Sequence, residues 1–177
     1  MNAVGEQLER ILTGTVAIVG VGSRGRGDDG AGPALIDRLR GRTTASLVEA
    51  DEVPESYLGE IIACKADTVL LVDAVAFGGR PGEVGLFCRE ELRNEPALST
   101  HRVPLRLVME YLAAETGARV LLLGIQPHVV SFGQGLSAAV RRTVDALGDA
   151  LSRLLDGEAA GSGRPTAYAA AAKERGL

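Results

Sequence analysis

Two neighbouring aspartates, Asp28 and Asp29, lie near the end of a glycine-rich stretch that reads GVGSRGRGDDGAGP and follows the apolar run TVAIV. A third carboxylate, Asp73, comes directly after the apolar run VLLV and before Ala-Val. An isolated charge at the end of a buried strand is costly, so such a carboxylate is expected to have a partner or a metal ion. The pattern indicates Asp29 and Asp73 as the residues best suited to chemistry.

Asp28 also has a structural interpretation. An aspartate just before a helix can cap its free backbone N–H groups, and acidic side chains favour the positive end of the helix dipole. Gly30, Gly32 and Pro33 would complete the turn into such a helix. We therefore predict that Asp28 caps the following helix, whereas Asp29 stays a functional candidate.

The chain has only two histidines, His101 and His128. Either imidazole could complete a metal site with the two carboxylates, and either could be an exposed loop residue. Two oxygens and one imidazole suit a borderline divalent ion such as nickel or zinc, and three protein ligands leave coordination positions open. The spacing by itself does not choose between the two histidines.

The glycine loop also satisfies the dinucleotide fingerprint G-x-G-x-x-G, with Gly20, Gly22 and Gly25. An acid that could bind a ribose, Glu49 or Asp51, stands near the end of the next strand-like run. Against this hypothesis, the adjacent aspartates would place negative charge where a pyrophosphate needs backbone N–H groups and a helix N-terminus. Dinucleotide binding is the least favoured of the interpretations.

Apolar runs rich in β-branched residues predict the strands, and stretches with helical periodicity lie between most of them. The predicted strands are residues 15–21, 46–50, 68–74, 84–88 and 119–125. The predicted helices are residues 31–40, 55–64, 104–115 and 136–155, with a weaker one at 2–12. This alternation predicts an α/β fold with a mainly parallel sheet.

On the way from the third strand to the fourth, only residues 77–82 lie between Ala76 and Glu83, and a parallel crossover needs a dozen residues or more. The fourth strand is therefore expected to run antiparallel. If the first and third strands are neighbours, as in a flavodoxin-like order, Asp29 and Asp73 approach the same crevice.

The 177 residues suit one domain, with 46% hydrophobic and 3% aromatic residues. A net charge of -4 argues against nucleic acid, and no apolar run suggests membrane insertion, so we expect a soluble cytoplasmic protein. Cys64 and Cys88 are expected to be reduced thiols without a role. We predict a single domain over residues 1–156 and a mobile, dispensable tail over 157–177, where Gly and Ala dominate.

Several ordered motifs resemble the nickel-iron hydrogenase maturation endopeptidases. The resemblance covers about Val16 to Leu154, and its fifth-strand motif is most similar to the branch for the hydrogenase of the formate hydrogenlyase complex. The matching motifs are GVGS with GDDGAGP in the glycine loop, LVDA around Asp73, STHRVPL around His101 and LGIQP before His128.

This resemblance implies a three-layer αβα sandwich and an aspartyl-type endopeptidase. Such an enzyme removes the C-terminal extension of a nickel-iron hydrogenase large subunit after nickel insertion. It also implies that Asp29, Asp73 and His101 bind the metal and act in catalysis, whereas His128 has no such role. The implied ion is the nickel already held by the substrate's cysteines, with zinc or cadmium able to substitute.

The chain departs from the family pattern in two places. Ser23 stands where the family usually has Asn, and EADE at residues 49–52 replaces an Asp-Gly-Gly run, which bears on contacts with the partner. Four arginines flank the expected crevice as solvated charges or as partners of an acidic segment: Arg24, Arg26, Arg102 and Arg106. A second class of function remains open, a non-catalytic nickel-sensing maturation chaperone that uses the same three ligands.

Overall fold

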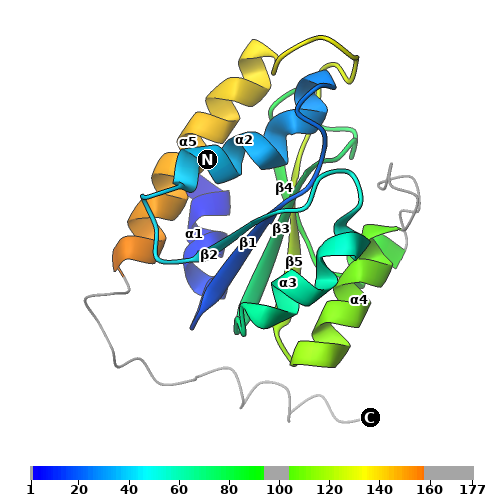
Figure 1. The fold of residues 1–177 in the computed structure, drawn as a ribbon. Helices are drawn as coiled ribbons and strands as arrows, with labels where there is room; N and C mark the ends of the chain where they lie inside the picture. Colours follow the sequence, from blue (N-terminus) through cyan, green and yellow to red (C-terminus); the bar gives the residue numbers. More distant parts are fainter. Residues whose placement is uncertain (1, 94–103, 158–177) are drawn as a thin grey trace.

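The computed structural model describes residues 2–93 and 104–157, which form a five-stranded sheet with helices on both faces (Figure 1). The strand order is β2-β1-β3-β5-β4, so the first and third strands are neighbours as the flavodoxin-like hypothesis requires. The strands are β1 (Val16–Gly20), β2 (Ser46–Glu49), β3 (Thr68–Ala74), β4 (Val84–Phe87) and β5 (Arg119–Ile125). The predicted α/β class and the predicted strands are confirmed.

Strand β4 runs antiparallel to β5, with Val84 opposite Ile125, whereas every other pair in the sheet is parallel. The short connection from β3 is bonded to Gln126, which follows β5. The Gln126 side-chain oxygen accepts hydrogen bonds from the backbone N–H groups of Phe77 at 2.9 Å and Gly79 at 3.1 Å. The predicted antiparallel direction of the fourth strand is therefore confirmed.

The helices form two layers around the sheet, which gives the three-layer αβα sandwich implied by the resemblance. Figure 1 shows α1 (Asn2–Ile11), α2 (Ala31–Leu39) and α5 (Ala138–Gly157) on one face, and α3 (Leu58–Ala63) with α4 (Leu105–Thr116) on the other. The described part of the chain also contains three short 3-10 turns, η1 (Gly27–Gly30), η2 (Pro54–Tyr57) and η3 (Glu91–Arg93). The helix predicted over residues 55–64 thus starts as the 3-10 turn η2.

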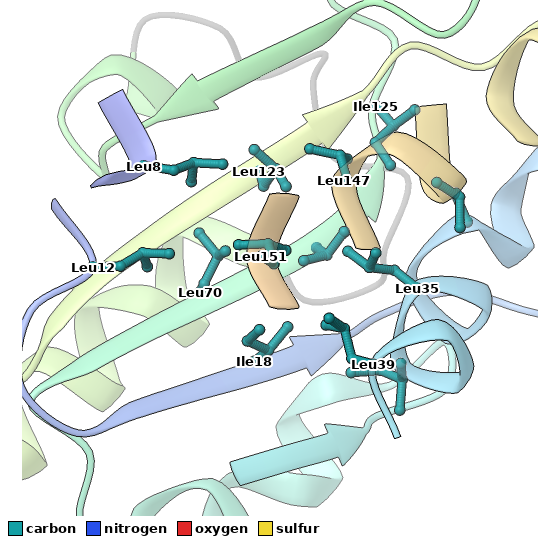
Figure 2. Packing of buried hydrophobic residues seen from close by; sticks show 14 of the residues in the cluster. Leu8, Leu12, Ile18, Leu35, Leu39, Leu70, Leu123, Ile125, Leu147 and Leu151 are labelled. Carbon is teal, nitrogen blue, oxygen red and sulfur yellow. The ribbon is translucent and has the colours of Figure 1, made fainter. Parts of the chain in front are cut away.

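The two cores follow the alternation of side chains along the central strands. Ile18, Leu70 and Leu123 pack toward α1, α2 and α5, where Leu35 and Leu151 meet them (Figure 2). The residues between them in β1, β3 and β5 pack toward α3 and α4. Because both faces are covered, these strands appear in the sequence as continuous apolar runs.

Some predictions concern residues that the structure does not describe. His101 and the tail from residue 158 onward lie outside the described residues, so the domain boundary and the mobility of the tail stay predictions. In residues 2–93 and 104–157, no helix combines the length and apolar character needed to cross a bilayer. Cys64 and Cys88 are both free thiols.

Candidate functional site

The glycine loop leaves β1 while bonded to both neighbouring strands. The Val21 N–H donates to the Val72 carbonyl of β3 at 2.8 Å, and the Gly22 N–H donates to the Asp51 carbonyl beyond β2, also at 2.8 Å. These two bonds fix the start of the loop at the carboxyl edge of the sheet. In sheets of this kind, that edge is where ligands bind.

Two glycines let the chain fold back over this edge. Gly22 has a φ of +118°, and a Cβ atom there would lie 1.9 Å from the Asp29 carbonyl oxygen. A Cβ on Gly32 would lie 2.4 Å from the Val21 oxygen and 2.5 Å from the Val72 oxygen. Only residues without a side chain permit these approaches, which bring η1 and the start of α2 onto the ends of β1 and β3.

Asp29 is held in this fold by the loop itself. Its side chain is buried, and Oδ2 accepts the Ser23 backbone N–H at 2.9 Å. The donor is the main chain, so this contact does not depend on the side chain at position 23. The replacement of the usual Asn by Ser23 therefore leaves the support of Asp29 intact.

Asp73 lies at the same edge, on the strand next to β1. It is 1% exposed, pairs in register with Gly124 of β5, and directly follows Val72, whose carbonyl accepts the Val21 N–H. The turn η1, which carries Asp29, packs against β3. The structure thus brings Asp29 and Asp73 to one edge from adjacent strands.

The third residue of the predicted set, His101, is outside the described residues. Within residues 2–93 and 104–157, no three His, Cys, Asp or Glu side chains gather into a possible metal site. Asp29 and Asp73 nevertheless fit a divalent ion, because two buried carboxylates supply hard oxygen donors whose negative charge a cation would offset. His128 is exposed, and its backbone N–H donates to Asp28 Oδ2 at 2.8 Å.

Asp28 has a different role from the predicted helix cap. Its fully buried carboxylate accepts the backbone N–H groups of His128 at 2.8 Å, Val129 at 3.0 Å and Ser137 at 2.6 Å. The N-cap position of α2 belongs to Gly30 instead. Burial alone would raise the pKa of Asp28, but these hydrogen bonds outweigh it and place the pKa below its ordinary value. The capping prediction was wrong, because Asp28 binds the loop after β5 rather than the helix that follows it.

Acidic residues at the end of β2 and just after it pair with the arginines of the glycine loop. Arg24 binds both carboxylate oxygens of Glu49, at 2.7 and 2.8 Å, and also pairs with Asp37. Arg26 pairs with Glu52 at 2.9 Å. The hydrogen bonds to Glu49 and Asp37 raise the pKa of Arg24.

Of the four flanking arginines, Arg106 pairs with Glu110 within α4 at 2.7 Å, and Arg102 lies outside the described residues. The residues that replace the Asp-Gly-Gly run therefore form ion pairs inside this chain. Arg24 and Arg26 therefore pair with acids of their own chain. The hypothesis that they are solvated charges alone does not describe them.

The arrangement argues against dinucleotide binding. The Ser23 N–H, which a phosphate would need, is bound by the Asp29 carboxylate. In the fingerprint, the third glycine permits close packing of helix and strand, yet a Cβ on Gly25 would meet no described atom within 4 Å. Gly32, outside the fingerprint, makes that close approach here.

Sequence reasoning missed two supporting residues, Asp28 as the holder of the loop after β5 and Gln126 as the holder of the β3–β4 connection. Their partners are backbone groups, which no sequence motif marks. The only hint was the position of Gln126 directly after a predicted strand.

Comparison with known proteins identifies the family of this chain. A model of the family described as hydrogenase maturation protease matches residues 34–153. The Hydrogenase 3 maturation protease of Escherichia coli (strain K12) is 29% identical over 133 residues, which cover 74% of this chain and 85% of that protein. The residues that the family model matches include Asp73 and the loop that follows β5, and they begin after Asp29.

Two solved structures described as HycI proteins are similar to this chain in fold. The crystal structure of a NiFe hydrogenase maturation protease HycI from Thermococcus kodakarensis has a TM-score of 0.78 at 34% identity, covering 85% of this chain and 99% of that chain. The solution structure of an endopeptidase HycI from Escherichia coli has a TM-score of 0.71 at 27% identity, covering 82% and 92%.

Proposed function

The chain belongs to the hydrogenase maturation protease family, and we propose that it is an endopeptidase that removes the C-terminal extension of a nickel-iron hydrogenase large subunit after nickel insertion. The observation that carries this proposal is the pair of buried carboxylates, Asp29 and Asp73, at one edge of the sheet. A buried pair of this kind, in which Asp29 accepts a backbone hydrogen bond, is suited to bind a cation and to handle protons.

In this proposal, Asp29, Asp73 and His101 bind the nickel that the precursor itself carries. Within the described residues, Asp29 Oδ2 receives the Ser23 N–H and Oδ1 receives no hydrogen bond, so Oδ1 is the oxygen open to the ion. Recognition of nickel in the substrate would restrict cleavage to loaded precursors. The protease would then need no resident metal of its own. Zinc or cadmium could substitute for nickel, bound by the same three residues.

Cleavage of a peptide bond requires a water to attack the scissile carbonyl while a base takes its proton. The bound ion supplies positive charge that orients the C-terminal segment of the precursor and polarises that carbonyl. A carboxylate of the pair, Asp29 or Asp73, accepts the proton from water as the new C–O bond forms. The same proton then passes to the leaving nitrogen as the C–N bond breaks, so the carboxylate is regenerated.

The place of action that we propose is the cytoplasm, where the hydrogenase precursor is loaded with nickel. The free state of both cysteines, Cys64 and Cys88, suits a reducing compartment.

The experiment that tests the proposal incubates the protein with a nickel-loaded precursor and with the same precursor lacking nickel, and measures the intact mass of each. We expect loss of the C-terminal peptide from the loaded precursor alone. The Asp29→Asn variant should bind the loaded precursor no better than the precursor that lacks nickel, and it should cleave neither of them. Stable binding of the loaded precursor with no change of mass would refute the peptidase and favour the nickel-sensing chaperone.

A further inference from the structure

The loop that joins β5 to α5 presents apolar side chains to solvent beside the glycine loop. Phe132 is 79% exposed, the largest exposed fraction among the large hydrophobic side chains of the described residues, and Val130 is 42% exposed. A phenylalanine side chain that stays exposed contributes little burial free energy to the stability of the folded monomer. Its place next to the candidate site points to a contact with the substrate.

This loop is fixed to the glycine loop by paired backbone bonds. The Gly27 N–H donates to Gln134 O at 3.0 Å, the Asp28 N–H to Val129 O at 2.9 Å, and the Gly133 N–H to Gly25 O at 3.0 Å. Gly27 has a φ of +63°, and a Cβ there would lie 2.7 Å from Val129 O. The two loops therefore form one unit with little freedom to separate.

The Asp28 carboxylate is the only charged side chain in this unit that is fully buried. Its two oxygens accept three backbone N–H groups of the loop, from His128, Val129 and Ser137. An asparagine in the same place would turn an NH2 group toward at least one of these donors. The carboxylate thus fixes both ends of the segment that carries Phe132.

Arg26 connects Phe132 with Asp29. The guanidinium carbon lies 5.1 Å from the centre of the Phe132 ring, within the range of a cation–π contact. The hydrogen bond to Glu52 raises the pKa of Arg26 most, and the charge of Asp29 adds to the same shift. The Asp29 backbone N–H donates to Arg26 O at 3.3 Å, so the residue that stacks on Phe132 is bonded to the backbone of Asp29.

We propose that Asp28 is a positioning residue for the proposed reaction: it holds the 128–137 loop so that Phe132 and Val130 contact an apolar part of the hydrogenase precursor next to Asp29. The inference rests on the proposed function, since the contact matters only if the precursor is the substrate. Asp28 acts through the loop and not on the scissile bond, so its removal should weaken binding more than it slows cleavage.

The test measures kcat and KM for cleavage of the nickel-loaded precursor by wild type, Asp28→Asn and Phe132→Ala. We expect each variant to raise KM by about tenfold while kcat changes by less than about twofold. The double variant should raise KM no further than the larger single effect, because both changes remove the same contact. Phe132→Leu, which keeps an apolar side chain, should recover most of the wild-type KM.

Asp67→Asn is the matched control, since Asp67 also accepts a backbone N–H, from Thr15 at 2.8 Å, but precedes β3 at the opposite edge of the sheet. Its KM should equal that of wild type. A KM within about twofold of wild type for Phe132→Ala would overturn the inference even if Asp28→Asn failed to fold. Absence of cleavage by wild type would instead refute the proposed function, and this inference with it.

Discussion

Gly32→Ala tests the close approach that places Asp29 over the sheet. The new Cβ would lie 2.4 Å from Val21 O, 2.5 Å from Val72 O and 2.6 Å from Val21 N, which are backbone atoms just after β1 and within β3. An ordinary nonbonded approach is roughly 3.5 Å, so each contact would be too short by about 1 Å. Because β1 and β3 are bonded on both sides, α2 must move away from the sheet and displace Asp29 with it.

The expected cost follows from two opposing effects. Overpacking of a tight contact costs about 1–3 kcal/mol, and three simultaneous backbone contacts favour the upper end. Alanine in place of glycine in a helix gains up to about 1 kcal/mol. We therefore expect a loss of about 2 kcal/mol in the free energy of unfolding, which for a chain of this size lowers Tm by about 4–8 °C.

Gly25→Ala is the matched control within the same loop. A Cβ on Gly25 would meet no described atom within 4 Å, and no left-handed φ is required there. Its unfolding free energy should lie within about 0.5 kcal/mol of wild type. Urea titrations followed by circular dichroism measure both variants. A neutral Gly32→Ala, or a Gly25→Ala that costs as much, would refute the packing argument.

Three further changes test other parts of the structure. Arg24→Ala should lower the unfolding free energy by about 1 kcal/mol or less, because its ion pairs are exposed. In urea titrations, this difference in unfolding free energy from wild type should become smaller between 0.1 and 1 M salt, roughly as screening predicts. A difference that does not depend on salt would contradict ion pairing. Asp67 accepts the Thr15 N–H and O–H, bonds that lower its pKa, so its contribution to stability is present above about pH 4 and is lost as pH falls through the folded pKa. The difference between wild type and Asp67→Asn in urea midpoint should therefore shrink on acidification, and growth of that difference would contradict the assignment. Leu70→Ala, at a fully buried position of the α5-side core, should cost about 2–5 kcal/mol in the same assay, and a cost below 1 kcal/mol would mean that the core is not packed as described.

The strands were predictable because the central sheet is buried on both faces. Residues 68–74 and 119–125 are strands over the full predicted ranges, since a continuous apolar, β-branched run has few other stable arrangements. The direction of β4 followed from the length of one connection. The helix after β2 was less predictable, because Pro54 starts a 3-10 turn that local periodicity does not distinguish from an α-helix.

The role of Asp28 could not be predicted, because its partners are remote in the chain. The donors to its carboxylate lie 100, 101 and 109 residues away and are backbone N–H groups, which carry no sequence pattern. A helix cap was the local alternative for an acid at that position. Asp29 and Asp73 could be paired in advance because the carboxyl ends of neighbouring parallel strands meet at one edge.

The pairs of Arg24 with Glu49 and of Arg26 with Glu52 were also beyond prediction from sequence. Opposite charges occur throughout the chain, and only the parallel register of β1 and β2 places these loops side by side. The departure from the Asp-Gly-Gly pattern is thus accompanied by internal ion pairs, which the sequence alone did not reveal.

The central claim is that carboxylates at the carboxyl edge of the sheet act on the precursor. The most direct measurement is the intact mass of a nickel-loaded large-subunit precursor after incubation with wild type, Asp73→Asn or Asp67→Asn, the last two being the same substitution near opposite ends of β3. We predict that wild type and Asp67→Asn remove the C-terminal peptide, whereas Asp73→Asn leaves the precursor mass unchanged. Cleavage by folded Asp73→Asn at the wild-type rate would contradict the claim.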